Sequence, residues 1–159
     1  MPKVVLAQIP VEKRDRIKVV FFGGTADEYV DELKAEIRKY GLENSIIFED
    51  FVTPSEALSL SDITVLPSLK EGFGIVSIES FLFKKPHIRT RTAGYEDIKD
   101  GCVGFDVGDS SALSQELIRF IDGKDYSDLV TRASQLLNEK CTLESMTNQI
   151  VEVYTEAMQ

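Results

Sequence analysis

Apolar residues occur along this chain in two alternating patterns. Short runs rich in β-branched and aromatic residues predict buried strands, and longer stretches with apolar residues three or four positions apart predict amphipathic helices. The predicted strands cover residues 17–22, 46–48, 63–66, 87–91 and 102–107. The predicted helices cover residues 26–40, 54–60, 75–83, 109–121, 126–140 and 143–158. Because the two kinds of element alternate, we predict an α/β fold with a doubly wound parallel sheet of about five to six strands and helices on both faces.

Residues 3–9 fit two interpretations. Their composition favours a strand, whereas the spacing of Val5, Leu6 and Ile9 also suits a short helix. A polar connection follows over residues 10–16. We expect its basic residues to form a solvated surface cluster of Lys13, Arg14 and Arg16.

Composition narrows the classes of protein that this chain can belong to. With 159 residues, of which 43% are hydrophobic, the chain is long enough for one compact domain, which we assign to residues 1–159. The formal charge of −9 argues against a general nucleic-acid binder, so any phosphate site must be local. We find neither an apolar run long enough to cross a membrane nor a secretory signal, and therefore expect a cytoplasmic protein.

The cysteines and the single histidine give no metal-binding pattern. Cys102 and Cys141 lie far apart, and we expect both to be reduced thiols, buried or half-buried. His87 begins a predicted strand, and a lone histidine is more often structural than catalytic.

The most informative stretch is a strand, a glycine-bearing turn and a helix, over residues 63–83. Open α/β sheets bind ligands where such a turn follows the carboxyl end of a parallel strand. Gly72 and Gly74 allow close approach of the backbone to a ligand and unusual dihedral angles. The amides of Gly74, Ile75 and Val76 should point outward from the helix N-terminus, which suits a phosphate.

Two glutamates flank this predicted phosphate site. Glu71 lies in the turn, and Glu79 lies eight residues later, on the helix face that also carries Ile75 and Leu82. Carboxylates accept hydrogen bonds from paired hydroxyls. The implied ligand has phosphates in the middle and hydroxyl-rich groups at both ends, as a nucleotide-diphosphate sugar has.

The stretch Pro67-Ser68-Leu69-Lys70-Glu71-Gly72-Phe73-Gly74, with Glu79, resembles the Glu-x7-Glu motif of retaining glycosyltransferases of family 4, also called group 1. These enzymes have the GT-B fold, in which two Rossmann-like domains face a cleft. The resemblance covers nearly the whole chain, but only the C-terminal, donor-binding domain of such an enzyme. It also favours a helix over residues 3–9. Ala93 departs mildly from the family, whose members often have Gly-Gly there, whereas Asp100-Gly101 and Gly104 match it.

The resemblance implies roles for individual residues. Glu71 would be the catalytic contact with the transferred sugar, and Glu79 would bind the ribose hydroxyls. The implied donor-binding residues are Gly23, Gly24, Phe51, Val52, Glu71, Gly72, Phe73, Gly74, Ile75, Val76 and Glu79. Of these, Gly23 and Gly24 could instead form a plain strand-to-helix turn, and Phe51 and Val52 could be ordinary core residues.

The resemblance also implies an activity: transfer of a hexosyl unit from a UDP- or GDP-linked sugar to a glycan or lipid acceptor, with retention of configuration and without a metal or other cofactor. The intact enzyme could then lie peripherally at a membrane. The family's Arg-to-Lys pattern, which neutralises the donor diphosphate, is not found before Ile17. Its absence favours an alternative, a non-catalytic nucleotide-binding or interaction module, which the Glu71 and Glu79 pair opposes.

We therefore expect a fragment that lacks the N-terminal acceptor domain, or a subunit whose partner carries it. The first strand of the donor domain, normally central in the sheet, is also not evident. Three explanations are open: residues 3–9 fill that position, the sheet is rearranged, or a partner fills the gap.

Overall fold

The computed structural model describes residues 2–23 and 28–158. The chain forms two compact units. The first comprises residues 1–60 and 105–125, and the second comprises residues 61–104 and 126–159.

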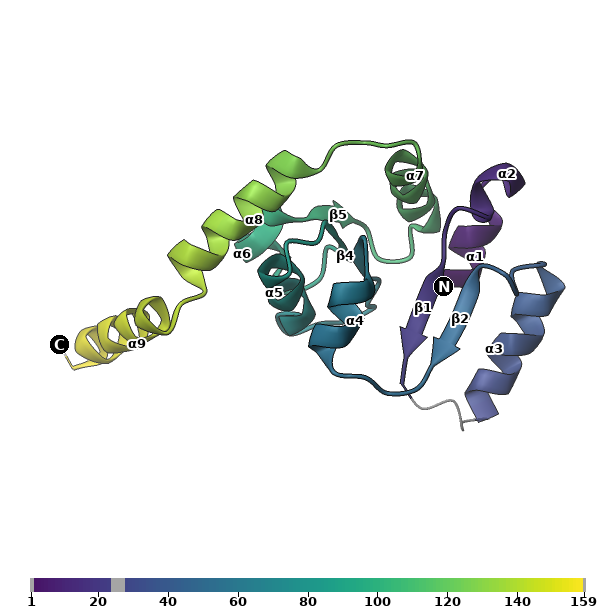
Figure 1. The fold of residues 1–159 in the computed structure, drawn as a ribbon. Helices are drawn as coiled ribbons and strands as arrows, with labels where there is room; N and C mark the ends of the chain where they lie inside the picture. The colour runs from purple at the N-terminus through teal and green to yellow at the C-terminus, as the bar shows by residue number, and fades with distance from the viewer. Residues whose placement is uncertain (1, 24–27, 159) are drawn as a thin grey trace. The chain divides into compact units, whose positions relative to one another are not determined.

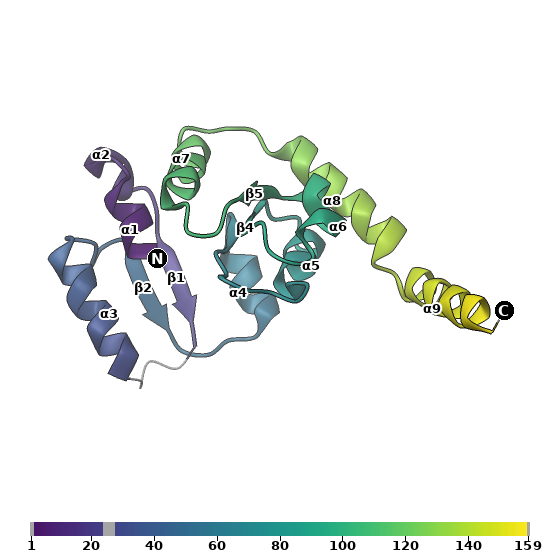
Figure 2. The same ribbon diagram turned by 180° about the vertical axis from the view of Figure 1, so that it is seen from behind.

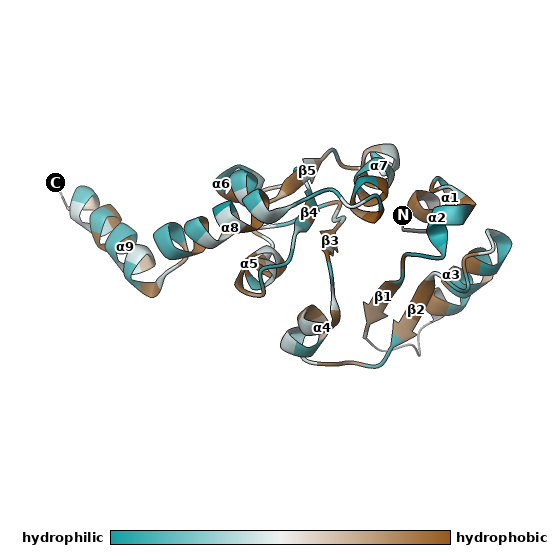
Figure 3. Ribbon diagram, turned by 45° about the horizontal axis from the view of Figure 1, so that its top comes forward, coloured by the Kyte–Doolittle hydropathy of each residue, from teal (hydrophilic) through white to brown (hydrophobic). Residues whose placement is uncertain are grey.

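The first unit contains a two-stranded parallel sheet with helices. Its strands are β1 (Val19–Phe22) and β2 (Ile46–Glu49), paired from Val19 opposite Ile46 to Phe22 opposite Glu49. Its helices are α1 (Pro2–Ala7), α2 (Val11–Arg14), α3 (Glu28–Lys39), α4 (Pro54–Leu60) and α7 (Ser110–Ile121). Helix α3 lies beside the β1–β2 pair in both views (Figures 1 and 2). Figure 3 shows that both strands are predominantly apolar.

Residues 3–9 belong to a helix and the turn after it, as the resemblance favoured. Val5, Leu6 and Ile9 are buried because α1 packs against α7, whose Leu113 and Leu117 are also buried. These residues therefore do not supply the missing strand.

The predicted connection over residues 10–16 contains α2, and its basic residues are not a purely solvated cluster. Arg14 donates from Nε to the carbonyl of Ile9 at 2.7 Å and from Nη2 to that of Ala7 at 2.6 Å, which satisfies acceptors at the end of α1. Lys13 forms an ion pair of 2.6 Å with Asp122, just after α7. Only Arg16 is exposed as predicted.

The second unit contains a three-stranded sheet in the order β3-β4-β5, whose β3 and β4 pair in parallel. The strands are β3 (Thr64–Leu66), β4 (His87–Thr90) and β5 (Val103–Phe105), which ends at the first residue of the first unit's second segment. The helices are α5 (Ile75–Leu82), α6 (Tyr95–Ile98), the 3-10 helix η1 (Lys99–Gly101), α8 (Ser127–Lys140) and α9 (Leu143–Ala157). Phe81, Ile98, Cys102 and Ala133 form a buried cluster among these helices.

The α/β class, the parallel pairing and the five strands were predicted correctly, but the distribution of these strands over two sheets was not predicted. The strands described by the structure form two sheets, one of two strands and one of three. The strands over residues 17–22 and 63–66 were predicted to be buried, but they are only partly so, since Val20 and Val65 are 38% and 37% exposed. The reason is that β1 and β3 are edge strands of their sheets, whereas the central strand β4 is buried along its whole length.

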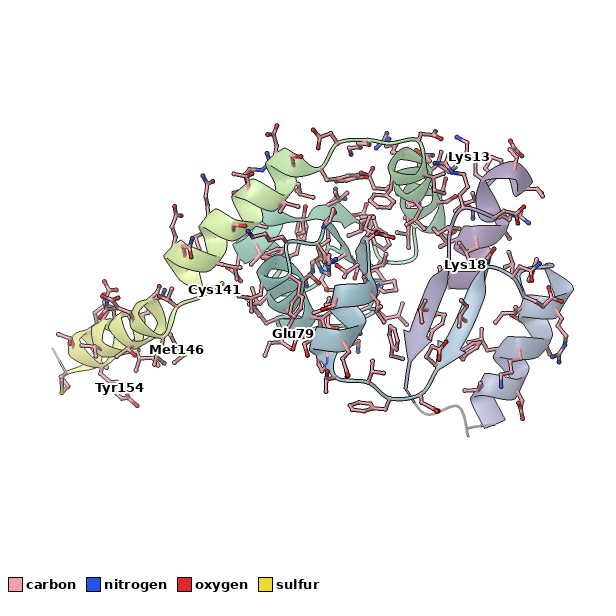
Figure 4. All side chains as sticks on the ribbon, viewed as in Figure 1. Lys13, Lys18, Glu79, Cys141, Met146 and Tyr154 are labelled. Atoms are coloured by element: carbon pink, nitrogen blue, oxygen red, sulfur yellow. The ribbon has the colours of Figure 1, made fainter. Side chains whose placement is uncertain are left out.

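Helix α9 carries an apolar stripe that is not packed. The large residues of this stripe are all exposed: Leu143, Met146, Ile150, Val153 and Tyr154. Their spacing places them on one side of the helix, and Figure 4 shows Met146 and Tyr154 projecting from it. No helix within residues 2–23 and 28–158 is both long and apolar enough to span a membrane.

Both cysteines are free thiols, but only Cys102 is buried as predicted. Burial raises the pKa of its thiol to about 11. Cys141 is exposed, so the expectation of a buried or half-buried position was wrong for this residue.

Candidate donor-binding site

Gly72 and Gly74 were predicted to give the turn between β3 and α5 unusual dihedral angles and room for close approach. The structure shows this geometry at Gly74 and not at Gly72. Gly74 is the N-cap of α5 and has a left-handed backbone with φ of 82°. A Cβ atom there would lie 3.0 Å from Cδ2 of Leu66 and 3.2 Å from Nη1 of Arg89, so space and dihedral angle both demand glycine. Gly72 has no positive φ, and a Cβ there would meet no atom within 4 Å. Its lack of a side chain only keeps the turn open.

The same turn presents unpaired backbone donors. Among the described residues, no acceptor is found for the amides of Gly72, Phe73, Gly74, Ile75 and Val76. The amides of Ile75 and Val76 belong to the first turn of α5, where N–H groups have no partner inside the helix. Together with the positive end of the helix dipole, they form an arrangement that can bind an anion.

Glu71 is held at one end of this row of amides. Its Oε1 atom accepts a hydrogen bond of 2.7 Å from Oγ of Ser68, and its side chain is half-buried. Within the described part of the chain, Oε2 has no hydrogen-bond partner. One oxygen therefore fixes the side chain and the other can accept from a ligand hydroxyl.

Glu79 lies on α5, on the face predicted for it. Its neighbours on that face, Ile75 and Leu82, are 70% and 63% exposed, whereas Ser77 and Phe81 on the other face are buried. The half-buried Glu79 side chain makes no hydrogen bond to any described residue, and Figure 4 marks its position on the helix. Both carboxylate oxygens can therefore accept from a pair of hydroxyls.

Strand β4 anchors the turn through two residues that sequence reasoning did not select. Thr90 donates from Oγ1 to the carbonyl of Ser68 at 2.8 Å, and Ser68 in turn holds Glu71. Arg89 donates from Nη1 to the carbonyl of Phe73 at 2.9 Å. The available signal was the composition of β4, because polar side chains in a central strand need buried partners.

His87 is a structural residue, as expected. It is fully buried, with Nε2 at 2.9 Å from Oγ of Ser77 and Nδ1 at 2.8 Å from Oγ1 of Thr64. Ser77 accepts from Nη1 of Arg89, so its own hydrogen can go to Nε2 of His87. This pattern assigns the ring proton to Nδ1. Burial, followed by the charge of Arg89, lowers the pKa of His87 from 6.5 to about 3.

The lowered pKa of His87 predicts a loss of stability in mild acid. Between the unfolded value of 6.5 and the folded value of about 3, only the unfolded chain binds the proton. The free energy of unfolding should therefore fall as the pH drops below about 6.5, by about 2 kcal/mol at pH 5 relative to pH 7. Urea unfolding at both values measures this difference. The variant His87→Gln should show a smaller difference, and a His87 ring that titrates near 6.5 in the folded protein would contradict the prediction.

The loop after β4 touches the turn directly. Gly94 has φ of 74°, and a Cβ atom there would lie 2.8 Å from Cα and 2.9 Å from the carbonyl oxygen of Phe73. A side chain at position 94 would therefore displace the turn. Ala93, where the sequence departs from the family, contributes its carbonyl to Nη2 of Arg89 at 3.1 Å.

The remaining predicted site residues lie in the first unit. Gly23 follows β1 and donates its amide to the carbonyl of Glu49, while Phe51 and Val52 follow β2. All three thus lie beyond the carboxyl ends of neighbouring parallel strands, where α/β folds place ligand sites. Phe51 is 80% exposed, so it is not a core residue, and Val52 is half-buried. Gly24 lies outside the described residues.

The described residues include no group of three or more His, Cys, Asp or Glu side chains that could hold a metal ion. The β3–α5 turn itself offers backbone amides and carboxylates, with the guanidinium of Arg89 behind them.

Comparison with known proteins assigns the chain to a family. The family of group 1 glycosyl transferases matches residues 3–139, and the chain belongs to it. Among curated proteins, the chain is 32% identical over 110 residues to EpsD of Bacillus subtilis (strain 168), which is named as a glycosyltransferase. That match covers 67% of this chain but only 28% of EpsD.

Solved structures have the same fold. Anabaena HepE in complex with UDP matches 97% of this chain and 44% of its own, with a TM-score of 0.81 and 21% identity. The C-terminal domain of LpcC, a group 1 glycosyl transferase of Francisella tularensis, matches 89% of this chain and 78% of its own, with a TM-score of 0.71 and 22% identity. The fold is thus the Rossmann-like α/β architecture found in GT-B glycosyltransferases. The chain spans less than half the length of HepE.

Proposed function

We propose that this chain is the C-terminal, donor-binding domain of a retaining glycosyltransferase. It binds a nucleotide-diphosphate sugar, from which the intact enzyme transfers a hexosyl unit to a glycan or lipid acceptor. The observation that carries this proposal is the row of unpaired amides at residues 72–76, flanked by the two available carboxylates of Glu71 and Glu79.

Each part of the site has a partner in such a donor. The amides of Ile75 and Val76 face the diphosphate, where charge develops as the nucleotide leaves. Glu71, fixed by Ser68, contacts hydroxyls of the transferred sugar, and Glu79 binds the ribose hydroxyls. The family resemblance also predicts donor-binding roles for Gly23, Phe51 and Val52 of the first unit. HepE, which shares the fold, has been solved with UDP and with UDP-glucose, which supports a uridine nucleotide as the first ligand to test.

The acceptor site is proposed to belong to further chain or to a partner subunit. The match to EpsD covers only 28% of that protein, which supports a longer functional enzyme. The exposed apolar stripe of α9, with Met146 and Tyr154, offers a surface for such a partner. We therefore expect the 159-residue chain alone to bind donor but to transfer little sugar.

Calorimetric titration of this chain with UDP, GDP and ADP tests the proposal. We expect one of these nucleotides to bind with measurably higher affinity than the others, because the base contacts differ while the diphosphate does not. The corresponding nucleosides should bind more weakly, since they lack the groups that the amides hold. Equal, weak binding of all three nucleotides would favour the alternative of an interaction module that has kept the fold without the activity.

A further inference from the structure

The structure contains a buried cation directly behind the proposed diphosphate site. Arg89 is 0% exposed and lies in the central strand β4. Its guanidinium donates only to neutral oxygens: the carbonyls of Phe73, Thr90 and Ala93 and the hydroxyls of Ser77 and Thr92. Among the described residues, no carboxylate lies within ion-pair distance of it.

A buried charge without a counter-charge is unusual. Lys, Arg, Asp and Glu are almost never fully buried unless they are paired, because burial removes the hydration of the charge. The neutral acceptors around Arg89 satisfy its hydrogen bonds but leave its formal positive charge uncompensated. An apolar residue at this position would avoid the cost of removing a charge from water. A functional role for Arg89 would account for that cost.

The direction of the bonds indicates what Arg89 acts on. In a trans peptide the C=O and the following N–H point in opposite directions. Because Nη1 of Arg89 holds the carbonyl of Phe73, the N–H of Gly74 is turned away from Arg89, toward the open side of the turn. The same guanidinium holds the carbonyl of Ala93 through Nη2, so it ties the loop after β4 to the turn before α5.

We propose that Arg89 is a positioning residue for the donor diphosphate: it orients the amide of Gly74, which precedes those of Ile75 and Val76, and supplies, from behind the turn, the positive charge that a bound diphosphate compensates. This inference rests on the proposed function in taking a nucleoside diphosphate as the ligand, but any diphosphate at this turn would experience the same charge. Removal of the charge should therefore affect ligands according to their phosphates and not according to their base.

The test compares Arg89→Met with Arg132→Met. Methionine keeps much of the apolar stem of arginine, and both variants change the net charge by the same amount. Arg132 is an exposed residue of α8 whose Nε donates to the carbonyl of Asp100, so it serves as the matched control. Circular dichroism and thermal melting establish that each variant is folded. Dissociation constants are measured for UDP, inorganic pyrophosphate and uridine.

We expect Arg89→Met to weaken the binding of UDP and of pyrophosphate by about tenfold, because the bound diphosphate loses the attraction of a buried positive charge. Uridine binding should change by less than about twofold, because the nucleoside carries no charge for Arg89 to attract. Arg132→Met should leave all three constants unchanged. A purely structural role of Arg89 would lower the affinity for uridine as well, and equal affinities of wild type and Arg89→Met for pyrophosphate would overturn the proposal.

A measurement on the wild-type chain covers the case in which Arg89→Met does not fold. Pyrophosphate should shift the NMR resonances of the Gly74 amide and of the Arg89 Nε–H group with the same dissociation constant. Shifts of Gly74 without any of Arg89 would overturn the inference.

The outcomes separate the inference from the proposed function. If the wild-type chain binds pyrophosphate but does not discriminate among the nucleotides, the role of Arg89 stands and the assignment as a donor-binding domain is refuted. If UDP binds equally well to wild type and Arg89→Met, the donor-binding domain stands and the role of Arg89 is refuted. If neither UDP nor pyrophosphate binds, both are refuted.

Discussion

Replacing Glu79 by alanine should weaken the binding of the preferred nucleoside diphosphate by roughly 10- to 150-fold. The estimate follows from the loss of hydrogen bonds to a charged carboxylate, which is worth about 1.5–3 kcal/mol. The substitution should have little effect on folding, because Glu79 lies on the outer face of α5 and its side chain makes no hydrogen bond to any other described residue. Calorimetric titration of the variant measures the loss of affinity, and a thermal melt checks the fold.

The control for Glu79→Ala is Glu139→Ala, an exposed residue of α8 in the same unit. It removes the same charge and should leave the affinity unchanged. The ligands give a second check, because Glu79 is proposed to bind the ribose and not the phosphates. Glu79→Ala should therefore reduce the affinity for UDP while pyrophosphate binding stays as in the wild type, whereas Arg89→Met should weaken the binding of both ligands. Undiminished UDP binding by Glu79→Ala would refute the ribose role.

Local patterns predicted most of the elements, because each depends on residues that are close in sequence. Helix α4 has the predicted bounds, Pro54–Leu60, and its start is fixed by a reciprocal pair: Thr53 donates its amide to Glu56, and Glu56 donates its amide to Oγ1 of Thr53. The hydrogen bond from the Thr53 side chain lowers the pKa of Glu56. Asp109, where the predicted helix over residues 109–121 begins, caps α7 by accepting from the amide of Ala112 at 2.8 Å.

The Glu-x7-Glu motif located the glycine turn and the two glutamates. It did not identify Arg89 and Thr90, whose hydrogen bonds hold the turn in place. Arg89 contacts Phe73 across 16 positions of sequence, and Thr90 contacts Ser68 across 22. The periodicity of hydrophobic residues along the chain does not predict such contacts, since they depend on the pairing of β3 with β4. The division into two sheets escaped prediction for the same reason: hydrophobic runs locate strands but do not say which strands pair. Amphipathicity similarly located α9 without revealing that its apolar side is exposed.

Gly94→Ala should lower the free energy of unfolding by about 3 kcal/mol or more. Two costs combine in this estimate. A non-glycine residue at φ of 74° costs of order 1–3 kcal/mol, and overpacking of a filled space costs typically 1–3 kcal/mol. Because the Cβ atom would meet backbone atoms of Phe73, a change of side-chain rotamer cannot relieve the contact. The turn must move, so nucleotide binding should be lost together with stability. Urea unfolding gives the first quantity and calorimetric titration the second.

Two glycine variants separate the costs in Gly94→Ala. Gly123 has φ of 88°, and a Cβ there would meet no atom within 4 Å, so Gly123→Ala measures the cost of the dihedral angle alone. Gly72→Ala has neither a positive φ nor a close contact and should cost less than about 0.5 kcal/mol. If Gly94→Ala lowers the free energy of unfolding no more than Gly123→Ala does and still binds nucleotide, the contact with Phe73 is dispensable. If it lowers the free energy of unfolding further and binding is lost, glycine is required at position 94 because the turn that presents the amides packs directly against it.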